Sequence, residues 1–145
     1  MPQSAIAAAL RRLGQRPYTA HEIAQYLVTR HYEQGEVAQA LARLGELGYL
    51  DDLEAARATV RYRLRHPRGR RLVAQELYRR GIDQETVSAA LADYDEAELA
   101  RALAERLERQ GKSGEALHRA LASRGFSPAA IPHQSSGWPP ESDIP

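Results

Sequence analysis

The sequence contains no cysteine, which excludes disulfide bonds, thiolate catalysis and cysteine-based zinc sites together. It also has no apolar run close to the ~20 residues that a membrane-spanning helix needs. The first residues, MPQSAIAAALRRLGQR, lack the basic-then-apolar pattern and the small-residue cleavage site of a secretory signal. Together these absences predict a cytoplasmic protein that does not enter a membrane.

Motifs of the common enzyme classes are missing as well. There is no Walker loop, no GxGxxG and no GxSxG. The five histidines, at positions 21, 31, 66, 118 and 133, show no ligand spacing such as HExxH, and we expect surface or packing roles for them. We therefore predict a protein that is not an enzyme and that needs neither a cofactor nor a metal.

The composition is that of an ordinary globular protein. Charged residues make up 27% of the 145 residues and the hydrophobic class 43%. This length suffices for one medium domain or for a few small units that share cores. The formal net charge is only +1, so any attraction to nucleic acid must come from local patches.

Helix formers dominate, and the helix boundaries are marked. No segment alternates β-branched and polar residues, so we predict no strands. Thr19 with Glu22 and Asp95 with Glu98 have capping-box spacing, and Ser127 before a proline is typical of a helix start. Helix ends are predicted at the glycines 14, 48, 81, 111 and 125.

An internal repeat runs through the chain. The repeated positions are Ile23, Leu27, His31, Tyr32 and Val37, then Val73, Leu77, Gly81, Ile82 and Val87, then Leu117, Leu121, Gly125, Phe126 and Ile131. Each unit combines an apolar-striped helix, a short turn and a second helix, and a third helix follows at 52–65 and 96–110. Such thin units must stack to share apolar surface. The first turn has His31 and Tyr32 instead of glycine and an apolar residue, and we expect that corner to differ.

The predicted fold is therefore all-α, with tandem three-helix repeats in an elongated, curved array and a truncated third repeat. Its predicted divisions are an N-terminal helix at 1–15, a first repeat at 16–66, a second at 67–111, a partial third at 112–131 and a flexible tail at 132–145. The tail is rich in proline and serine. Its Trp138 is either a loosely docked aromatic residue or an anchor for a partner.

Charge is distributed unevenly. Residues 55–81 contain nine arginines and one acid, a local charge of +8, whereas residues 82–108 contain eight acids and two arginines, a local charge of −6. The nine arginines are Arg57, Arg61, Arg63, Arg65, Arg68, Arg70, Arg71, Arg79 and Arg80. We predict that they form a surface that binds DNA phosphate or an acidic protein partner.

The helix predicted after Asp52 carries the densest part of this surface. Ala56, Val60 and Leu64 are expected to face the core, because they lie four residues apart. Arg57, Arg61 and Arg65 follow one position later and form a basic stripe beside that face. A run of charges is usually a solvated helix face. Here like charges four residues apart repel one another, and this unfavourable arrangement indicates a binding function.

Tyr62 and Tyr78 lie among the arginines, either as packing residues or as stacking platforms for bases.

Residues 48–52, GYLDD, place two aspartates side by side. Asp51 and Asp52 could be a metal-binding or catalytic pair, or they could begin a helix. Asp51 has capping-box spacing to Glu54, and no histidine or cysteine lies nearby in the sequence. We predict a helix-capping role for both aspartates, at the joint where the first repeat turns into its basic helix.

GYLDD followed by an alanine-rich basic helix, together with GRRLVAQELYRRGI at 69–82 and the tandem three-helix units, resembles the RecX family over about residues 10–131. The resemblance implies an all-helical protein that binds RecA and lies along the groove of the RecA–single-stranded DNA filament. Binding along the groove and capping of the filament ends both stay open from the sequence, and we expect a monomer. The resemblance also implies contact with the DNA phosphate backbone and inhibition of strand exchange, ATP hydrolysis and the SOS co-protease role. It implies no enzymatic activity, no cofactor and no membrane.

Two other functions stay open from the residues alone. One is a stand-alone helix-turn-helix DNA-binding protein that acts as a transcriptional regulator, which predicts sequence-selective duplex binding without RecA. The other is a scaffold that binds only protein, which predicts almost no affinity for single-stranded DNA at low salt.

Overall fold

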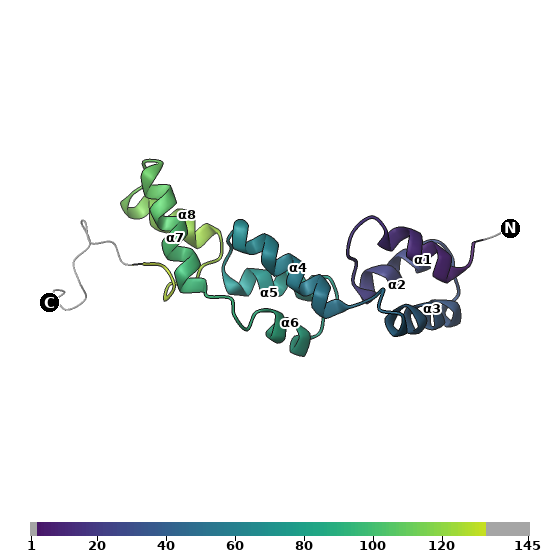
Figure 1. The fold of residues 1–145 in the computed structure, drawn as a ribbon. Coiled ribbons are helices and arrows are strands. Elements are labelled where there is room, and N and C mark those ends of the chain that lie inside the picture. Colours follow the sequence, from purple (N-terminus) through teal and green to yellow (C-terminus); the bar gives the residue numbers. More distant parts are fainter. Residues whose placement is uncertain (1–2, 133–145) are drawn as a thin grey trace. The chain divides into compact units, whose positions relative to one another are not determined.

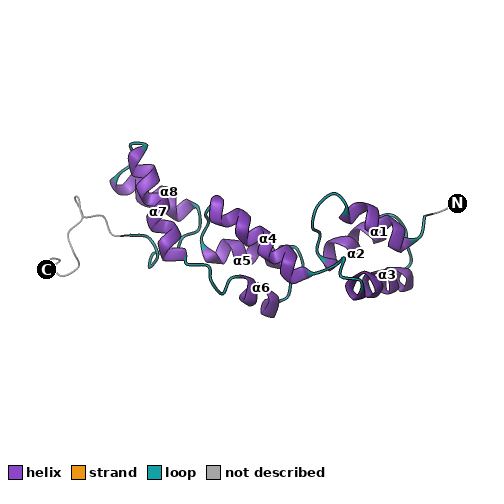
Figure 2. Ribbon diagram, viewed as in Figure 1, coloured by secondary structure: helices purple, strands orange, loops and turns teal. Residues whose placement is uncertain are grey.

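The computed structural model describes residues 3–132, and within them it contains eight α-helices and no strand (Figures 1 and 2). The all-α prediction is confirmed. The predicted tail with Trp138 lies, apart from Pro132, outside the described residues. The helices are α1 (Ala5–Leu13), α2 (Ala20–Thr29), α3 (Gln34–Glu46), α4 (Asp52–Arg65), α5 (Arg70–Arg79), α6 (Gln84–Ala90), α7 (Glu96–Arg109) and α8 (Gly114–Ser123).

The chain divides into two compact units. Within the described residues, the first unit comprises residues 3–61 together with Ala74–Ala92, and the second comprises Tyr62–Val73 together with residues 93–132. Helices α4 and α5 each run from one unit into the other. None of the helices in the described part of the chain has the length and apolarity that a bilayer span requires.

In the first unit, α1, α2 and α3 pack on one another (Figure 1). The core contains Ile23 and Leu27 of α2 and Leu44 of α3, all fully buried. Helix α1 contributes the small side chains of Ala8 and Ala9, which let its backbone approach the other two helices closely. The apolar spacing that marked the repeat therefore identifies the buried face of α2 correctly.

In the second unit, α7 and α8 enclose a separate core. Leu103 and Leu107 of α7 pack with Leu117 and Leu121 of α8, and Phe126 closes the end of this core. In the later two repeats the equivalent apolar positions are also buried, namely Val73, Leu77, Ile82, Val87, Leu117, Leu121, Phe126 and Ile131. The repeat thus reflects shared packing positions.

The turn after the striped helix has the same backbone in all three repeats. His31, Gly81 and Gly125 adopt φ values of 69°, 82° and 83°, in the left-handed region. The prediction that the first corner differs is wrong for the backbone. The left-handed conformation costs a non-glycine residue such as His31 about 1 kcal/mol of conformational free energy, whereas glycine adopts it without this cost. The corner does differ in its side chain, because Tyr32 is only half-buried and its hydroxyl donates to the Gln3 carbonyl at 2.6 Å.

The predicted helix starts at Thr19 and Asp95 are confirmed. Thr19 and Glu22 form both hydrogen bonds of a capping box, and the Asp95 side chain accepts from the backbone N–H of Glu98 at 3.1 Å. The helix start predicted at Ser127 is wrong: residues 128–130 form a single turn, in which the N–H groups of Ala130 and Ile131 both donate to the Ser127 carbonyl. A capping signal starts a helix only if packing supports the turns that follow.

Candidate nucleic-acid and partner interface

The two aspartates of GYLDD serve two different helices. The Asp51 side chain accepts from the backbone N–H of Glu54 at 3.1 Å and so caps α4. Asp52 reaches 32 residues back along the chain, where its Oδ1 accepts from the N–H of Ala20 at 2.9 Å, at the first residue of α2. The segment therefore begins α4 and fastens it to the start of α2. Within residues 3–132 no group of histidine and acidic side chains is arranged to hold a metal.

Arg80 lies at the centre of the same joint. Its carbonyl accepts from the hydroxyl of the fully buried Thr19 at 2.6 Å. Its guanidinium donates to both carboxylate oxygens of Glu22 at 3.0 and 3.2 Å, and also to the Thr59 hydroxyl at 2.9 Å and the Pro17 carbonyl at 3.1 Å. The donors of Arg80 are thus taken up within the first unit, which leaves its side chain little capacity for an external phosphate.

The carboxylate of Glu22 is adapted to this pairing. Burial raises the pKa of Glu22, but hydrogen bonds from Arg80 and from the backbone N–H of Thr19, with the charges of Arg80 and Arg16, outweigh it and lower the net pKa below the ordinary 4.5. The side chains of Arg80 and Glu22 are only 17% and 20% exposed. The joint is therefore a charged, largely buried contact between the start of α2 and the turn after α5.

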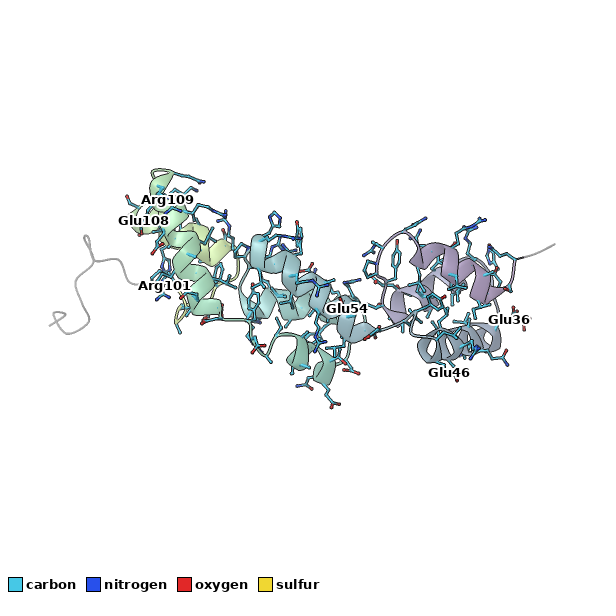
Figure 3. All side chains as sticks on the ribbon, viewed as in Figure 1. Glu36, Glu46, Glu54, Arg101, Glu108 and Arg109 are labelled. Carbon is cyan, nitrogen blue, oxygen red and sulfur yellow. The ribbon has the colours of Figure 1, made fainter. Side chains whose placement is uncertain are left out.

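Helix α4 presents the predicted stripe on its surface. Arg57, Arg61 and Arg65 are exposed and lie four residues apart along one continuous helix. Arg61 pairs with Glu54 at 2.8 Å, with the two side chains 58% and 54% exposed, so the pair contributes little to stability. The sequence analysis did not identify Glu54 as the partner of Arg61 (Figure 3, where Glu54 is labelled). The two residues are seven positions apart, which is about two helical turns, so they lie on the same side of α4.

The apolar side of α4 is shorter than its periodicity predicts. Ala55 and Ala56 are buried and Val60 is half-buried, but Leu64 is 47% exposed. The prediction that Leu64 faces the core is wrong. Helical spacing assigns a residue to a face, but it does not tell how far along that face a packing partner extends.

The two tyrosines of the basic region are not buried packing residues. Tyr62 is 46% exposed and Tyr78 is 45% exposed. The centroids of the Tyr62 and His66 rings are 4.4 Å apart. The guanidinium carbon of Arg63 lies 4.9 Å from the centroid of the Tyr62 ring. These contacts hold the aromatic ring beside basic side chains at the end of α4.

The remaining arginines of the predicted set are divided between the two units. Arg79, like Arg57, Arg61 and Arg80, belongs to the first unit, and the second unit holds Arg63, Arg65, Arg68, Arg70 and Arg71. Arg63 and Arg70 are half-buried. Among the residues that the structure describes, no ion pair involves Arg57, Arg65, Arg68, Arg71 or Arg79, and all five are exposed.

Much of the acidic 82–108 region stabilises its own helices. Asp83 caps α6, and its hydrogen bonds from the Thr86 side chain and backbone N–H lower the pKa of this carboxyl. Asp95 caps α7, and Glu98 pairs with Arg101 one turn later (Figure 3, where Arg101 is labelled). Glu96 accepts from the N–H of Ser127 at 2.9 Å. These acids are explained by local structure without a basic partner protein.

Comparisons with known proteins assign the family. Residues 5–44 match the family model described as the RecX first three-helix domain, and residues 51–91 match the RecX second three-helix domain. A protein of Halorhodospira halophila named Regulatory protein RecX is 38% identical over 127 residues, which cover 83% of this chain and 79% of that protein. The chain belongs to the RecX family.

Other RecX proteins agree in sequence and fold. Regulatory protein RecX of Mycobacterium sp. strain KMS is 43% identical over 108 residues, which cover 74% of this chain and 58% of the relative. The chain thus spans little more than half the length of this relative. The crystal structure of RecX from Lactobacillus salivarius matches with a TM-score of 0.76 at 23% identity, covering 88% of this chain and 89% of that one, which shows a shared fold.

The RecX domain models divide the helices as α1–α3 and α4–α6. The repeats predicted from the sequence, at 16–66 and 67–111, begin one helix later than the RecX domains. Both divisions are possible because a tandem repeat can be divided before any of its helices. In the first third, the single core shared by α1, α2 and α3 favours the RecX division. The GYLDD segment then lies at the boundary between the two domains.

Proposed function

We propose that this chain acts as a regulator of RecA: it binds RecA and the RecA filament on single-stranded DNA, as a monomer in the cytoplasm. There it inhibits ATP hydrolysis, strand exchange and the SOS co-protease role. The proposal rests on membership of a family whose proteins are named regulatory proteins, and on the exposed arginines of α4. That name also supports action by binding rather than by catalysis.

The observation that carries the proposal is the exposure of the stripe. Arg57 and Arg65 have exposed side chains, and no described ion pair occupies them. Arg61 is partly neutralised by Glu54. Uncompensated guanidiniums spaced along one helix suit DNA phosphate or an acidic protein surface, because each offers a planar fork of N–H donors.

Exposure and existing partners support different roles for the arginines of the proposed surface. We propose Arg57 and Arg65 as the principal contacts and Arg61 as a weaker one, with Arg68, Arg71 and Arg79 as further exposed candidates. Arg63 and Arg70 remain in the proposed surface as half-buried contributors. Arg80 is better explained as part of the joint, because its guanidinium already has Glu22, Thr59 and Pro17 as partners.

The deciding experiment is a titration of this protein into RecA hydrolysing ATP on single-stranded DNA. The unchanged protein should inhibit hydrolysis, and the triple variant Arg57→Glu, Arg61→Glu, Arg65→Glu should not, because it reverses the charge that attracts phosphate or acidic side chains. The matched control reverses three exposed arginines elsewhere, at Arg106, Arg109 and Arg119, and should inhibit like the unchanged protein.

Circular dichroism must show that both triple variants keep the helix content of the unchanged protein. Full inhibition by the α4 variant would remove the stripe from the interface. Sequence-selective binding to duplex DNA with no effect on RecA would replace the proposal by a stand-alone helix-turn-helix protein.

A further inference from the structure

The first three-helix domain carries a second group of basic side chains, none of which belongs to α4. Three arginines and two tyrosines alternate in the order Arg16, Tyr18, Arg12, Tyr26, Arg30, and we name them the arginine–tyrosine ladder. The successive distances from guanidinium carbon to ring centroid are 4.0, 4.9, 4.8 and 5.2 Å. Helix α1 supplies Arg12, α2 supplies Tyr26, and the loop between them and the end of α2 supply the rest.

Each tyrosine ring of the ladder already holds two guanidiniums. Tyr18 has Arg12 and Arg16 within 4.9 Å, and Tyr26 has Arg12 and Arg30 within 5.2 Å. The attraction between cation and ring positions the arginines and limits their rotamers. Both rings are half-buried, so the domain core anchors the ladder from below.

The positive charge of the ladder is poorly compensated. Over residues 3–132, neither Arg12 nor Arg30 makes an ion pair. Arg16 lies 3.7 Å from Glu22, but that carboxylate is held more closely by Arg80, at 3.0 Å. No acid occurs in residues 1–21 of the sequence. The labelled acids of this domain, Glu36 and Glu46, lie on α3, which contributes nothing to the ladder (Figure 3).

Arg12 is the least expected member of the ladder. Its side chain is half-buried, and its Nε is buried without a hydrogen-bond acceptor among the described residues. Holding a charged group partly out of water with no anion beside it costs free energy. Such a cost is accepted where the group is held ready for a ligand.

The shape of the guanidinium group determines which ligand the ladder suits. Its N–H donors lie in the plane of the group and point outward from its edges. Those edges can donate two parallel hydrogen bonds to a phosphate. Each ring, by contrast, already has two guanidiniums within 5.2 Å of its centroid, which leaves less room for a nucleic-acid base.

We propose that the arginine–tyrosine ladder is a second anion site, in the first three-helix domain, that binds the phosphodiester backbone of a nucleic-acid strand. The net positive charge favours a strand of phosphates over a protein surface, because protein interfaces centre on buried apolar side chains. Recognition by phosphate contact alone is independent of base sequence. The site uses none of the arginines of the α4 stripe, and its binding of the strand does not need RecA.

The test measures binding of labelled oligothymidylate to the full chain, without RecA, across a series of salt concentrations. Arg30→Gln should weaken binding and make the slope of log affinity against log salt shallower by about 0.7, the value for one phosphate contact on a single strand. The double variant Arg12→Gln, Arg30→Gln should lose about twice that slope. The control Arg43→Gln removes one exposed charge from α3 and should leave the slope unchanged.

Arg30 is exposed, and its only described side-chain contact is the ring of Tyr26, so its variant should keep the circular dichroism spectrum of the unchanged protein. An unchanged slope in Arg30→Gln and in the double variant would overturn the proposal. So would a loss of RecA inhibition with oligothymidylate binding intact, which would assign the ladder to a protein surface. If the ladder variants lose DNA binding while the unchanged protein does not inhibit RecA, the ladder site stands and the RecA function fails.

Discussion

The joint at Thr19 and Arg80 and the joint at Gly69 and Arg124 use equivalent positions of two repeats, and each holds the carbonyl of its arginine. Thr19 precedes Ile23 by four residues, as Gly69 precedes Val73, and Arg124 occupies the position of Arg80. In the first unit the Thr19 hydroxyl donates to the Arg80 carbonyl at 2.6 Å. In the second unit the Gly69 N–H donates to the Arg124 carbonyl at 2.8 Å. Each joint fastens the start of one helix to the turn that ends another.

The side chains around the two joints differ in kind. The guanidinium of Arg80 binds Glu22 across the first joint, whereas Leu72 takes the place of Glu22 in the second. Arg124 consequently turns back and donates to the Ala120 carbonyl of its own helix, at 2.9 Å. The second joint is instead closed by close approach, with Gly69 against the Gly125 carbonyl and Gly125 against Leu72.

The comparison teaches that the carbonyl at equivalent positions of two repeats can be held by two kinds of chemistry. A charged network in the first joint satisfies several donors and acceptors at once, and removing one partner leaves the others unpaired. The second joint needs no charge, but it tolerates no side chain at its glycines. The two joints should therefore fail under different substitutions.

The largest expected effect is that of Gly69→Ala, which would break the second joint. A Cβ on Gly69 would lie 1.8 Å from the Gly125 carbonyl oxygen, and backbone atoms cannot move aside cheaply. We expect the free energy of unfolding to fall by about 3 kcal/mol, measured by urea denaturation. Gly35→Ala is the control: nothing lies within 4 Å of its Cβ and it sits in α3, so it should stabilise by up to about 1 kcal/mol. Equal effects at both glycines would show that close approach does not define the joint.

An intermediate effect is expected when the two equivalent arginines are truncated. Arg80→Ala should lower the free energy of unfolding by about 2 kcal/mol, because it leaves Glu22 and Thr59 without their partner in a largely buried network. Arg124→Ala removes one hydrogen bond within its own helix and should cost only about 0.5 kcal/mol. Urea denaturation gives both values, and amide hydrogen exchange should show faster opening at the start of α2 only in Arg80→Ala. Similar losses in both variants would mean that the ion pair adds nothing to the first joint.

The smallest effect is a dependence on pH that belongs to the first joint alone. Because the folded-state pKa of Glu22 is lowered, its contribution to stability is fully present above its ordinary value of 4.5 and is lost as pH falls through the folded-state pKa. The unchanged protein should therefore lose more stability on acidification than Glu22→Gln, whose side chain does not titrate. Urea denaturation of both proteins at neutral pH and below pH 4.5 tests this difference. Parallel pH profiles would show that the carboxylate is not stabilised by Arg80.

Local features of the fold were predictable from the sequence because they depend on residues a few positions apart. The capping box of Thr19 and Glu22, the buried repeat positions and the helix at 52–65 all follow from spacings of three or four residues. The stripe on α4 follows in the same way. The turn at Ser127 was not predictable from its cap alone, because helix propagation also needs packing.

The candidate site was predictable only as a set of residue types. Nine arginines were grouped by their nearness in sequence, but Arg80 pairs with Glu22, 58 residues away, and so serves the joint. Asp52 likewise caps a helix that begins 32 residues earlier. The arginine–tyrosine ladder has no helical period, because a loop places Arg16 and Tyr18 between the two helices that complete it.

By itself, then, the sequence determined most of the helices, the caps at Thr19, Asp51 and Asp95, and the concentration of positive charge, since each is set by interactions within about one helical turn. Only the tertiary structure decided which of those charges are available to a partner. A guanidinium is free or occupied according to the groups that folding brings to it, and for Arg80 these are Pro17, Glu22 and Thr59. Folding brings no ion-pair partner to Arg57 among the described residues, so its guanidinium remains exposed and uncompensated on the surface.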